Sequence, residues 1–272
     1  MLDNINQIEV DEFNRTSAIL AINKPAGMTS HDVVDAVRKK LRTRKVGHAG
    51  ALDPFATGVL LIMVGKYTKK SMELMRKDKE YSCSILLGIA TTTQDPEGKV
   101  TKVDVKDIEQ DDLFKLEGIK KGYNQRVPLF SSVKVEGQKL RQLAHRAKEY
   151  KFAREDKVEL LMKDGSIKQV ILPRKEVYFS KFEIGGLKSV AIGDLEEKLF
   201  TQLKANDIDI NTSMTELRLV VACSKGTYIR QLAEDIGNLL GTPAMLHKLE
   251  RTRVAEITLD QCISIEDIPK LQ

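Results

Sequence analysis

The chain has few of the residues that form disulfides or hold metal ions. Only three cysteines occur in 272 residues, widely spaced at Cys83, Cys223 and Cys262. Each has apolar or β-branched neighbours, a setting that favours buried free thiols in a reducing compartment. The four histidines are scattered and lack a Cys-x-x-Cys or His-x-Glu partner. This pattern argues against a zinc deaminase, and we expect no metal site.

Long apolar runs and leader signals are also missing. No apolar run approaches the ~20 residues that a membrane-spanning helix needs. Residues 1–14 are acidic and polar, unlike a signal or transit peptide. We therefore expect a cytoplasmic protein with no membrane partner. Residues 58–66 have the wrong glycine spacing for a phosphate loop, so we expect no nucleotide there.

What the sequence does contain is a sizeable apolar fraction and clustered positive charge. Hydrophobic residues make up 42% of the chain, enough to bury a core in one large domain or two smaller ones. The net charge is +5, and six of the eight residues 38–45 are Lys or Arg. A further basic segment covers residues 134–154. Such clusters suit a phosphate backbone, although each can also be a solvated helix face.

The most informative segment is residues 47–60, with the sequence GHAGALDPFATGVL. Its glycines permit turn geometries closed to other residues, and Pro54 biases Asp53 toward an extended backbone. The apolar run 59–64 predicts a buried strand that ends at Gly65. A carboxylate on a rigid turn at the edge of a core is well placed for chemistry. An isolated Asp-Pro, in contrast, is more often only a turn.

The whole segment resembles the signature of the TruB family of tRNA pseudouridine synthases, in which the aspartate of Gly-His-x-Gly-x-Leu-Asp-Pro is catalytic. Other family motifs are matched in the same order at residues 24–30, 79–95, 131–137, 224–230 and 249–252. The matches extend from about Lys24 to Val254, nearly the whole chain. The resemblance implies an isomerase that converts uridine to pseudouridine. Because this reaction conserves atoms, it implies no cofactor.

The resemblance and the local patterns together predict the fold class. We expect a mixed α/β (α+β) fold, with a largely antiparallel mixed sheet flanked by helices, as a single catalytic domain over residues 1–272. The family implies an RNA-gripping loop at residues 127–153. A hairpin around an Asp-Gly turn at 155–172 and a helical segment at 192–211 look like insertions. Since little sequence follows Ile257, we expect the family's C-terminal PUA-type domain to be absent.

The resemblance assigns the catalytic roles to three residues. Asp53 is the nucleophile or electrostatic partner and must be ionised for either role. Arg230 is its ion-pair partner, because a guanidinium stays charged and can hold both carboxylate oxygens in a fixed fork. Tyr81 stacks on the target base. Taken alone, Tyr81 reads as a half-buried strand residue and Arg230 as a surface helix residue.

Further residues are carried over as contacts of the RNA. His48 is expected to fill the gap that a flipped uridine leaves behind. The other expected contacts are the pocket walls Tyr228 and Leu249, the supporting residues Lys24 and Lys69, and the loop cations Lys134, Lys139, Arg141 and Arg146.

Three functions are compatible with this sequence. We expect a stand-alone, monomeric synthase that binds the T arm of tRNA and modifies the T-loop uridine, position 55 in tRNA numbering. One alternative is a guide-RNA-dependent synthase of ribosomal RNA, and another is a non-catalytic protein that binds RNA or helps tRNA fold. Activity on bare tRNA separates the first from the second. Loss of modification with retained binding in Asp53→Asn distinguishes catalysis from binding.

Overall fold

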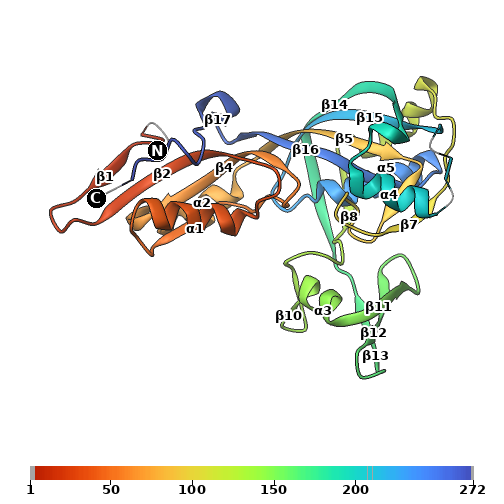
Figure 1. Ribbon diagram of the computed structural model, residues 1–272, viewed down its shortest axis with the longest axis horizontal. Helices are drawn as coiled ribbons and strands as arrows, with labels where there is room; N and C mark the ends of the chain where they lie inside the picture. Colours follow the sequence, from red (N-terminus) through yellow and green to blue (C-terminus); the bar gives the residue numbers. More distant parts are fainter. Residues whose placement is uncertain (1–3, 207, 210, 271–272) are drawn as a thin grey trace.

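The computed structural model describes residues 4–206, 208–209 and 211–270. In this part of the chain the main sheet has the strand order β1-β2-β4-β16-β5-β15-β14-β8, with β17 beside β16 and β3 beside β4 (Figure 1). The strands are β1 (Ile8–Val10), β2 (Thr16–Lys24), β3 (Val46–His48), β4 (Thr57–Val64), β5 (Lys79–Leu87), β8 (Gly122–Arg126), β14 (Arg174–Ala191), β15 (Ser213–Cys223), β16 (Ala244–Val254) and β17 (Ile257–Thr258). Paired strands are antiparallel except β4 and β16, which are parallel. The expected mixed fold with a largely antiparallel sheet is confirmed.

The N-terminal half of the sheet is covered by α1 (Ser30–Lys40). Thr29 caps this helix in a reciprocal arrangement with Asp32, which satisfies free backbone N–H groups of the first turn. The apolar face of the helix packs on the buried runs of β2 and β4. The capped helix therefore fixes the loop that precedes it.

The other half of the sheet has a helix on each face. On one face α5 (Ile229–Leu240) packs against apolar residues of β5, β15 and β16. This helix ends at Gly241, whose φ of 75° is the left-handed conformation that favours glycine. On the other face α4 (Glu197–Ala205) buries Leu199 and Leu203 against Leu86 and Met245. The helix expected in the insertion at 192–211 is present.

The two halves meet where β4 runs parallel to β16. Gly58 pairs with Arg251 at this point and has a φ of 103°. A Cβ atom at position 58 would lie only 2.3 Å from the backbone oxygen of Arg251. Only glycine permits this close approach, so residue 58 determines how the segment that carries Asp53 enters the sheet.

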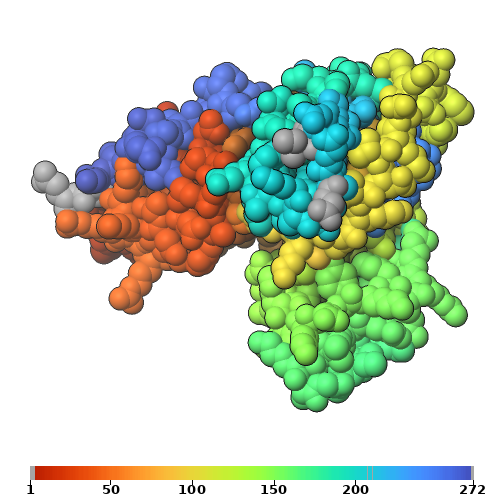
Figure 2. Space-filling view, turned by 45° about the vertical axis from the view of Figure 1, so that its right-hand side comes forward, coloured from red at the N-terminus to blue at the C-terminus, as the bar shows by residue number. Residues whose placement is uncertain are grey.

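Residues 127–172 form a small unit that projects from the sheet (Figures 1 and 2). Its elements are β9 (Lys134–Val135), β10 (Gln138–Lys139), α3 (Leu140–Arg146), β11 (Ala147–Phe152), β12 (Lys157–Met162) and β13 (Ile167–Ile171). The expected loop and the expected hairpin are joined, because β11 pairs with β12. They also share one apolar core, in which Leu140 and Leu143 pack with Val158 and Leu160. We call residues 127–172 the loop module.

The second insertion is fastened to the sheet by a buried histidine. His247 of β16 lies with one ring nitrogen 2.8 Å from Glu216 of β15 and the other 2.9 Å from Glu196, which precedes α4. Burial alone would lower the pKa of His247, but the two carboxylates outweigh it and raise the pKa. Residues 207 and 210 of the expected insertion 192–211 lie outside the described residues.

The remaining elements connect these parts. They are η1 (Gly65–Lys70), α2 (Ser71–Arg76), β6 (Ile89–Thr91), β7 (Val100–Val103), η2 (Gln110–Ile119), η3 (Ile192–Asp194) and η4 (Leu259–Gln261). Among the described residues, no helix combines the length and the apolar character needed to cross a membrane.

The histidine contact predicts a pH-dependent contribution to stability. The folded pKa of His247 is raised above its ordinary 6.5, so its contribution is complete below pH 6.5 and is lost as the pH rises through the raised value. Burial would raise the pKa of Glu216, yet His247 and other partners lower it below 4.5, so the carboxylate's contribution is lost as the pH falls. The difference in Tm between wild type and His247→Gln should therefore be largest between the lowered pKa of Glu216 and the raised pKa of His247. It should shrink toward alkaline pH. A difference that grows above pH 7 would contradict this assignment.

Candidate active site

The turn that carries Asp53 is held by hydrogen bonds to its backbone on both sides of Asp53. The Ser30 hydroxyl accepts from the Leu52 N–H at 2.8 Å and donates to the Leu52 oxygen at 3.1 Å. The Gly27 N–H donates to the Pro54 oxygen at 2.9 Å. Gly27 belongs to the segment that leads into α1, and Ser30 is the first residue of that helix. The capped helix therefore fixes the backbone immediately before and after Asp53.

Lys24 adds a third support and does not have the position expected for a substrate contact. Its side chain is fully buried, and the ammonium donates to the backbone oxygens of Pro25 (2.7 Å), Met28 (2.7 Å) and Pro54 (3.1 Å). Burial lowers the pKa of Lys24 to about 8. Since no part of it reaches the surface, Lys24 cannot touch RNA in this arrangement. It ties the Asp53 turn to the segment before α1.

Arg251 supports the same turn from the side of β16. It is 1% exposed, and its guanidinium donates to the backbone oxygens of Val59 (2.7 Å), Gly50 (3.2 Å) and Ala51 (3.5 Å). Residue 251 falls within one of the matched family motifs, but no pattern in the sequence assigns it a role. Its three acceptors come from a different part of the chain, so no local signal points to them.

Asp53 and Arg230 form the ion pair that the resemblance implies. Arg230 is the second residue of α5, and its Nε donates to Oδ2 of Asp53 at 2.8 Å. A second bond joins Nη2 to Oδ1 at 3.3 Å, so the guanidinium holds both carboxylate oxygens. The Arg230 side chain is 8% exposed and that of Asp53 is 35% exposed. The carboxylate therefore remains open to solvent while its cation is buried.

Arg230 also contacts three other groups. Its Nη1 donates to the Thr93 oxygen at 3.0 Å and its Nη2 to the Phe130 oxygen at 3.2 Å. A second carboxylate, Asp95, lies 3.7 Å from Nε and is 4% exposed. Burial would lower the pKa of Arg230, but Asp53 and Asp95 together raise it. Arg230 is thus a permanent cation shared by two acids.

Asp95 is the site residue that sequence reasoning missed. The sequence shows it as the first residue of an Asp-Pro turn, and that turn is present, with the Gly98 N–H donating to the Asp95 oxygen at 3.2 Å. Burial raises the pKa of Asp95, and the hydroxyl of Thr93 and the cation of Arg230 counteract part of that rise. A carboxylate in a turn is usually a surface group, so only its burial identifies it as part of the site.

Tyr81, Leu249 and Tyr228 are the residues expected to contact the target base. Tyr81 of β5 is opposite Arg251 of β16, and Leu249 lies two residues earlier on the same strand. Tyr81 packs against the apolar cluster that contains Leu249 and Leu52. Burial raises the pKa of Tyr81, so its phenol stays protonated at neutral pH. Tyr228 precedes α5 and is half-buried.

His48 ends β3 just before the Asp53 turn and is half-buried. Its Nδ1 is buried without a hydrogen-bond partner among the described residues. Burial, assisted by the cation of Arg251, lowers the pKa of His48 below its ordinary 6.5. The ring is therefore neutral at physiological pH, and one polar atom still lacks a partner.

Lys69 is not brought to this site. It is exposed on η1, which begins at Gly65 beyond the far end of β4. Gly65 lies against Thr16 at the start of β2, whereas Lys24 at the other end of β2 lies near the Asp53 turn. The length of the strand β4 therefore separates Lys69 from Asp53. The expectation that Lys69 supports the site is wrong for this structure.

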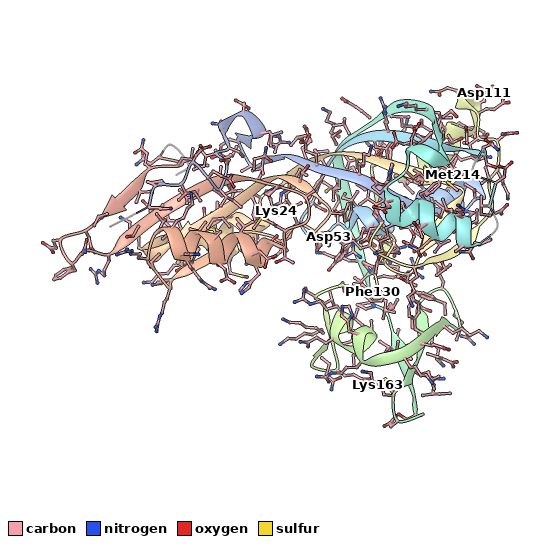
Figure 3. The ribbon with its side chains drawn as sticks, in the orientation of Figure 1. Lys24, Asp53, Asp111, Phe130, Lys163 and Met214 are labelled. Atoms are coloured by element: carbon pink, nitrogen blue, oxygen red, sulfur yellow. The ribbon has the colours of Figure 1, made fainter. Side chains whose placement is uncertain are left out.

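The four expected cations lie on the loop module. Lys134, Arg141 and Arg146 are exposed and Lys139 is half-buried. The module reaches the ion pair through Phe130, whose backbone oxygen accepts from Arg230 and whose ring packs edge-on against His145 and Tyr150. Figure 3 shows Phe130 between Asp53 and Lys163, the latter near the tip of the hairpin. The base of the module is thus fixed relative to Asp53.

A cleft of about 780 Å³ adjoins the Asp53 turn. Its lining residues include Phe55, Leu249, Pro96, Glu97 and Glu196, whereas Asp53 and Arg230 are not among them. The site therefore combines a solvent-accessible carboxylate, a buried cation, a protonated phenol and a neutral imidazole beside an open cleft. This set can stabilise or attack an electron-poor carbon of a bound molecule.

Comparisons with known proteins point to one family. Residues 38–169 match the family model described as TruB family pseudouridylate synthase (N terminal domain). The chain is 35% identical over 261 residues to tRNA pseudouridine synthase B of Staphylococcus saprophyticus, covering 94% of this chain and 72% of the relative. It is 36% identical over 255 residues to tRNA pseudouridine synthase B of Bacillus subtilis, covering 93% of this chain and 70% of the relative.

Solved structures show the same fold. A chain of a Cbf5-Nop10-Gar1 complex matches with a TM-score of 0.55 and 22% identity, over 97% of this chain and 60% of that chain. A chain of an H/ACA RNP bound to a substrate RNA containing 2′-deoxyuridine matches with a TM-score of 0.55 and 20% identity, over the same shares. The chain therefore spans about three fifths of the length of these solved chains, and the likeness concerns the fold.

The shared guanidinium predicts a large loss of stability when its charge is removed. Arg230→Met leaves the buried Asp95 without its cation, and breaking a buried pair in this way costs about 3–5 kcal/mol. Urea denaturation should show a loss of this size at neutral pH, and a smaller loss in acid, where Asp95 is protonated. Arg44→Met, which removes an exposed arginine, is the control and should change little. A loss below ~1 kcal/mol in Arg230→Met would contradict the assigned network.

Proposed function

The chain belongs to the TruB family of pseudouridylate synthases, and from this premise we propose which uridine it modifies and which residues act. It is an enzyme that converts uridine to pseudouridine in tRNA, as its relatives named tRNA pseudouridine synthase B do. The target is the T-loop uridine at position 55 in tRNA numbering. The observation that carries the proposal is the forked Asp53–Arg230 pair beside the cleft.

Asp53 is the nucleophile of the proposed mechanism. Its carboxylate attacks the bound nucleoside, the bond between N1 and C1′ breaks, and the base rotates. C1′ then bonds to C5, and the bond between Asp53 and the nucleoside breaks, which restores the free carboxylate. The hydrogen of C5 leaves as a proton and N1 takes up a proton, so the atoms balance without a cofactor. Arg230 aims the carboxylate, because its cation is buried and its fork holds both oxygens.

The target base must leave the stacked T loop before Asp53 can reach it. Extruding a base costs a few kcal/mol, which other contacts must offset. His48 fills the vacated space: it is flat, flanked by Gly47 and Ala49, and its burial keeps it neutral. Tyr81 and Leu249 enclose the everted base, and Tyr228 lies at the entrance to α5 as a further wall.

The loop module provides the proposed grip on the T arm. Lys134, Lys139, Arg141 and Arg146 lie on one folded unit whose base is bonded to Arg230 through Phe130. Binding there places the RNA backbone in a fixed position relative to Asp53. We place the enzyme in the cytoplasm. We treat it as a monomer, because every group of the proposed mechanism comes from one chain.

Two other functions explain the observations less well. A guide-RNA-dependent synthase of ribosomal RNA needs partner proteins. The chain is more similar to the relatives named tRNA pseudouridine synthase B, at 35–36% identity, than to the chain of the Cbf5-Nop10-Gar1 complex, at 22%. A protein that only binds or folds RNA has no use for a buried arginine aimed at a solvent-accessible aspartate. Modification of bare tRNA in the absence of partners would decide among the three.

Removing the charge of Asp53 should abolish the reaction without weakening RNA binding. Asp53→Asn keeps the size of the side chain but loses its negative charge, so release of tritium from C5-labelled uridine in T-arm RNA should fall by at least ~10³-fold. Filter binding should show an unchanged Kd for the same RNA. Asp111→Asn, far from the site in Figure 3, is the matched control. Tritium release by Asp53→Asn near the wild-type rate would overturn the assignment.

The loop cations should determine the salt dependence of RNA binding. Removing one cation that neutralises an RNA phosphate reduces the slope of log K against log salt by about 0.7–0.9. A triple variant with alanine at Lys134, Arg141 and Arg146 should therefore bind with a slope that is smaller by about two, with kcat nearly unchanged at saturating RNA. Alanine at the exposed Lys99, Lys102 and Lys188 removes the same charge elsewhere. Equal slopes in both triple variants would exclude the loop module as the RNA grip.

A further inference from the structure

The helical insertion contacts the turn that carries Asp95. On α4, the side chain of Gln202 accepts from the Val100 N–H at 2.8 Å and donates to the Gly98 oxygen at 3.2 Å. One turn earlier, the Lys198 ammonium donates to the Glu97 oxygen. Three backbone groups just after Asp95 thus have their partners on a segment that is about 100 residues away in sequence.

The insertion can act as a support because it is itself fixed at several points. Leu199 and Leu203 are fully buried against β5 and β16. The residue before the helix, Glu196, is bonded to the buried His247, which is bonded in turn to Glu216. The face of α4 that carries Gln202 is therefore held relative to the central strands.

The supported turn is compact, so a displacement at Gly98 is transmitted to Asp95. The Gly98 N–H donates to the Asp95 oxygen at 3.2 Å, and the Glu97 N–H donates to Oδ1 of Asp95 at 3.0 Å. A Cβ atom at position 98 would lie 2.5 Å from the Thr93 hydroxyl. Thr93 and Asp95 are also the residues through which this turn contacts Arg230.

From these contacts we infer that Gln202 is a positioning residue for catalysis: it holds the 93–98 turn so that Thr93 and Asp95 orient Arg230 toward Asp53. The inference rests on the proposed function. Among the partners of Arg230, Asp53 takes part in the reaction, and Thr93 and Asp95 lie on this turn. Loosening the turn lets the guanidinium rotate and weakens its fork on Asp53. Since small displacements of catalytic groups are costly, the effect falls on kcat.

The test compares Gln202→Met with Thr201→Met. Methionine keeps the length and helix propensity of glutamine but removes both hydrogen bonds. Thr201 is exposed on the same helix, so its variant is the matched control. With tRNA labelled at uridine C5, Gln202→Met should lower kcat by ~10-fold, and KM should stay within about twofold. Thr201→Met should change neither by more than about twofold.

A double-mutant cycle tests whether Gln202 acts through Asp95. In an Asp95→Asn background, adding Gln202→Met should lower the single-turnover rate by less than about twofold, because the group that it orients is already changed. The full ~10-fold fall in that background would overturn the inference. A rise in KM without a fall in kcat would also overturn it. If Gln202→Met does not fold, Lys198→Met gives the deciding measurement. This variant removes the hydrogen bond from the exposed Lys198 of α4 to the Glu97 oxygen of the turn.

Failure of this inference can be distinguished from failure of the proposed function. If wild type and Thr201→Met release no tritium from tRNA, the proposed function is wrong. If both are active and Gln202→Met matches them, the function stands and the positioning role is wrong.

Discussion

One buried guanidinium organises the active site. Arg230 lies within ion-pair distance of Asp53 and Asp95 and donates to the backbone oxygens of Thr93 and Phe130. In a medium of low dielectric such a cation must have its partners in place, and they must have it. The turn that carries Asp53, the turn that carries Asp95 and the base of the loop module are therefore fixed relative to one another. The fold brings three distant segments to one charge.

Much of the fold could be predicted because its signals are local. An unbroken apolar run gives β4, a Thr-x-x-Asp cap gives the start of α1, and apolar residues at helical spacing followed by Gly241 give α5. The ion pair is different. Asp53 and Arg230 are 177 residues apart, and no periodicity connects them. Their pairing was predicted only from the family motifs, and the structure then placed them at hydrogen-bond distance.

The rest of the site could not be predicted because it depends on burial and on distance along a strand. Lys24 reads as a surface cation, yet it is buried and donates to three carbonyls, two from the segment before α1 and one from the Asp53 turn. Asp95 reads as a turn residue, yet it is buried beside Arg230 of α5. Lys69 follows Asp53 closely in sequence, but an intervening strand of eight residues places it at the opposite end of the sheet. Such positions follow only from tertiary packing.

The account is tested most directly by a crystal structure of the enzyme bound to T-arm RNA that carries 5-fluorouridine at the target position. Fluorine replaces the hydrogen that must leave C5, so the complex should stop after the base has been everted. We predict a carboxylate oxygen of Asp53 within ~3.5 Å of the target nucleoside, with the fork to Arg230 intact. A target base that remains stacked in the loop, or lies against another acid, would contradict the central claim.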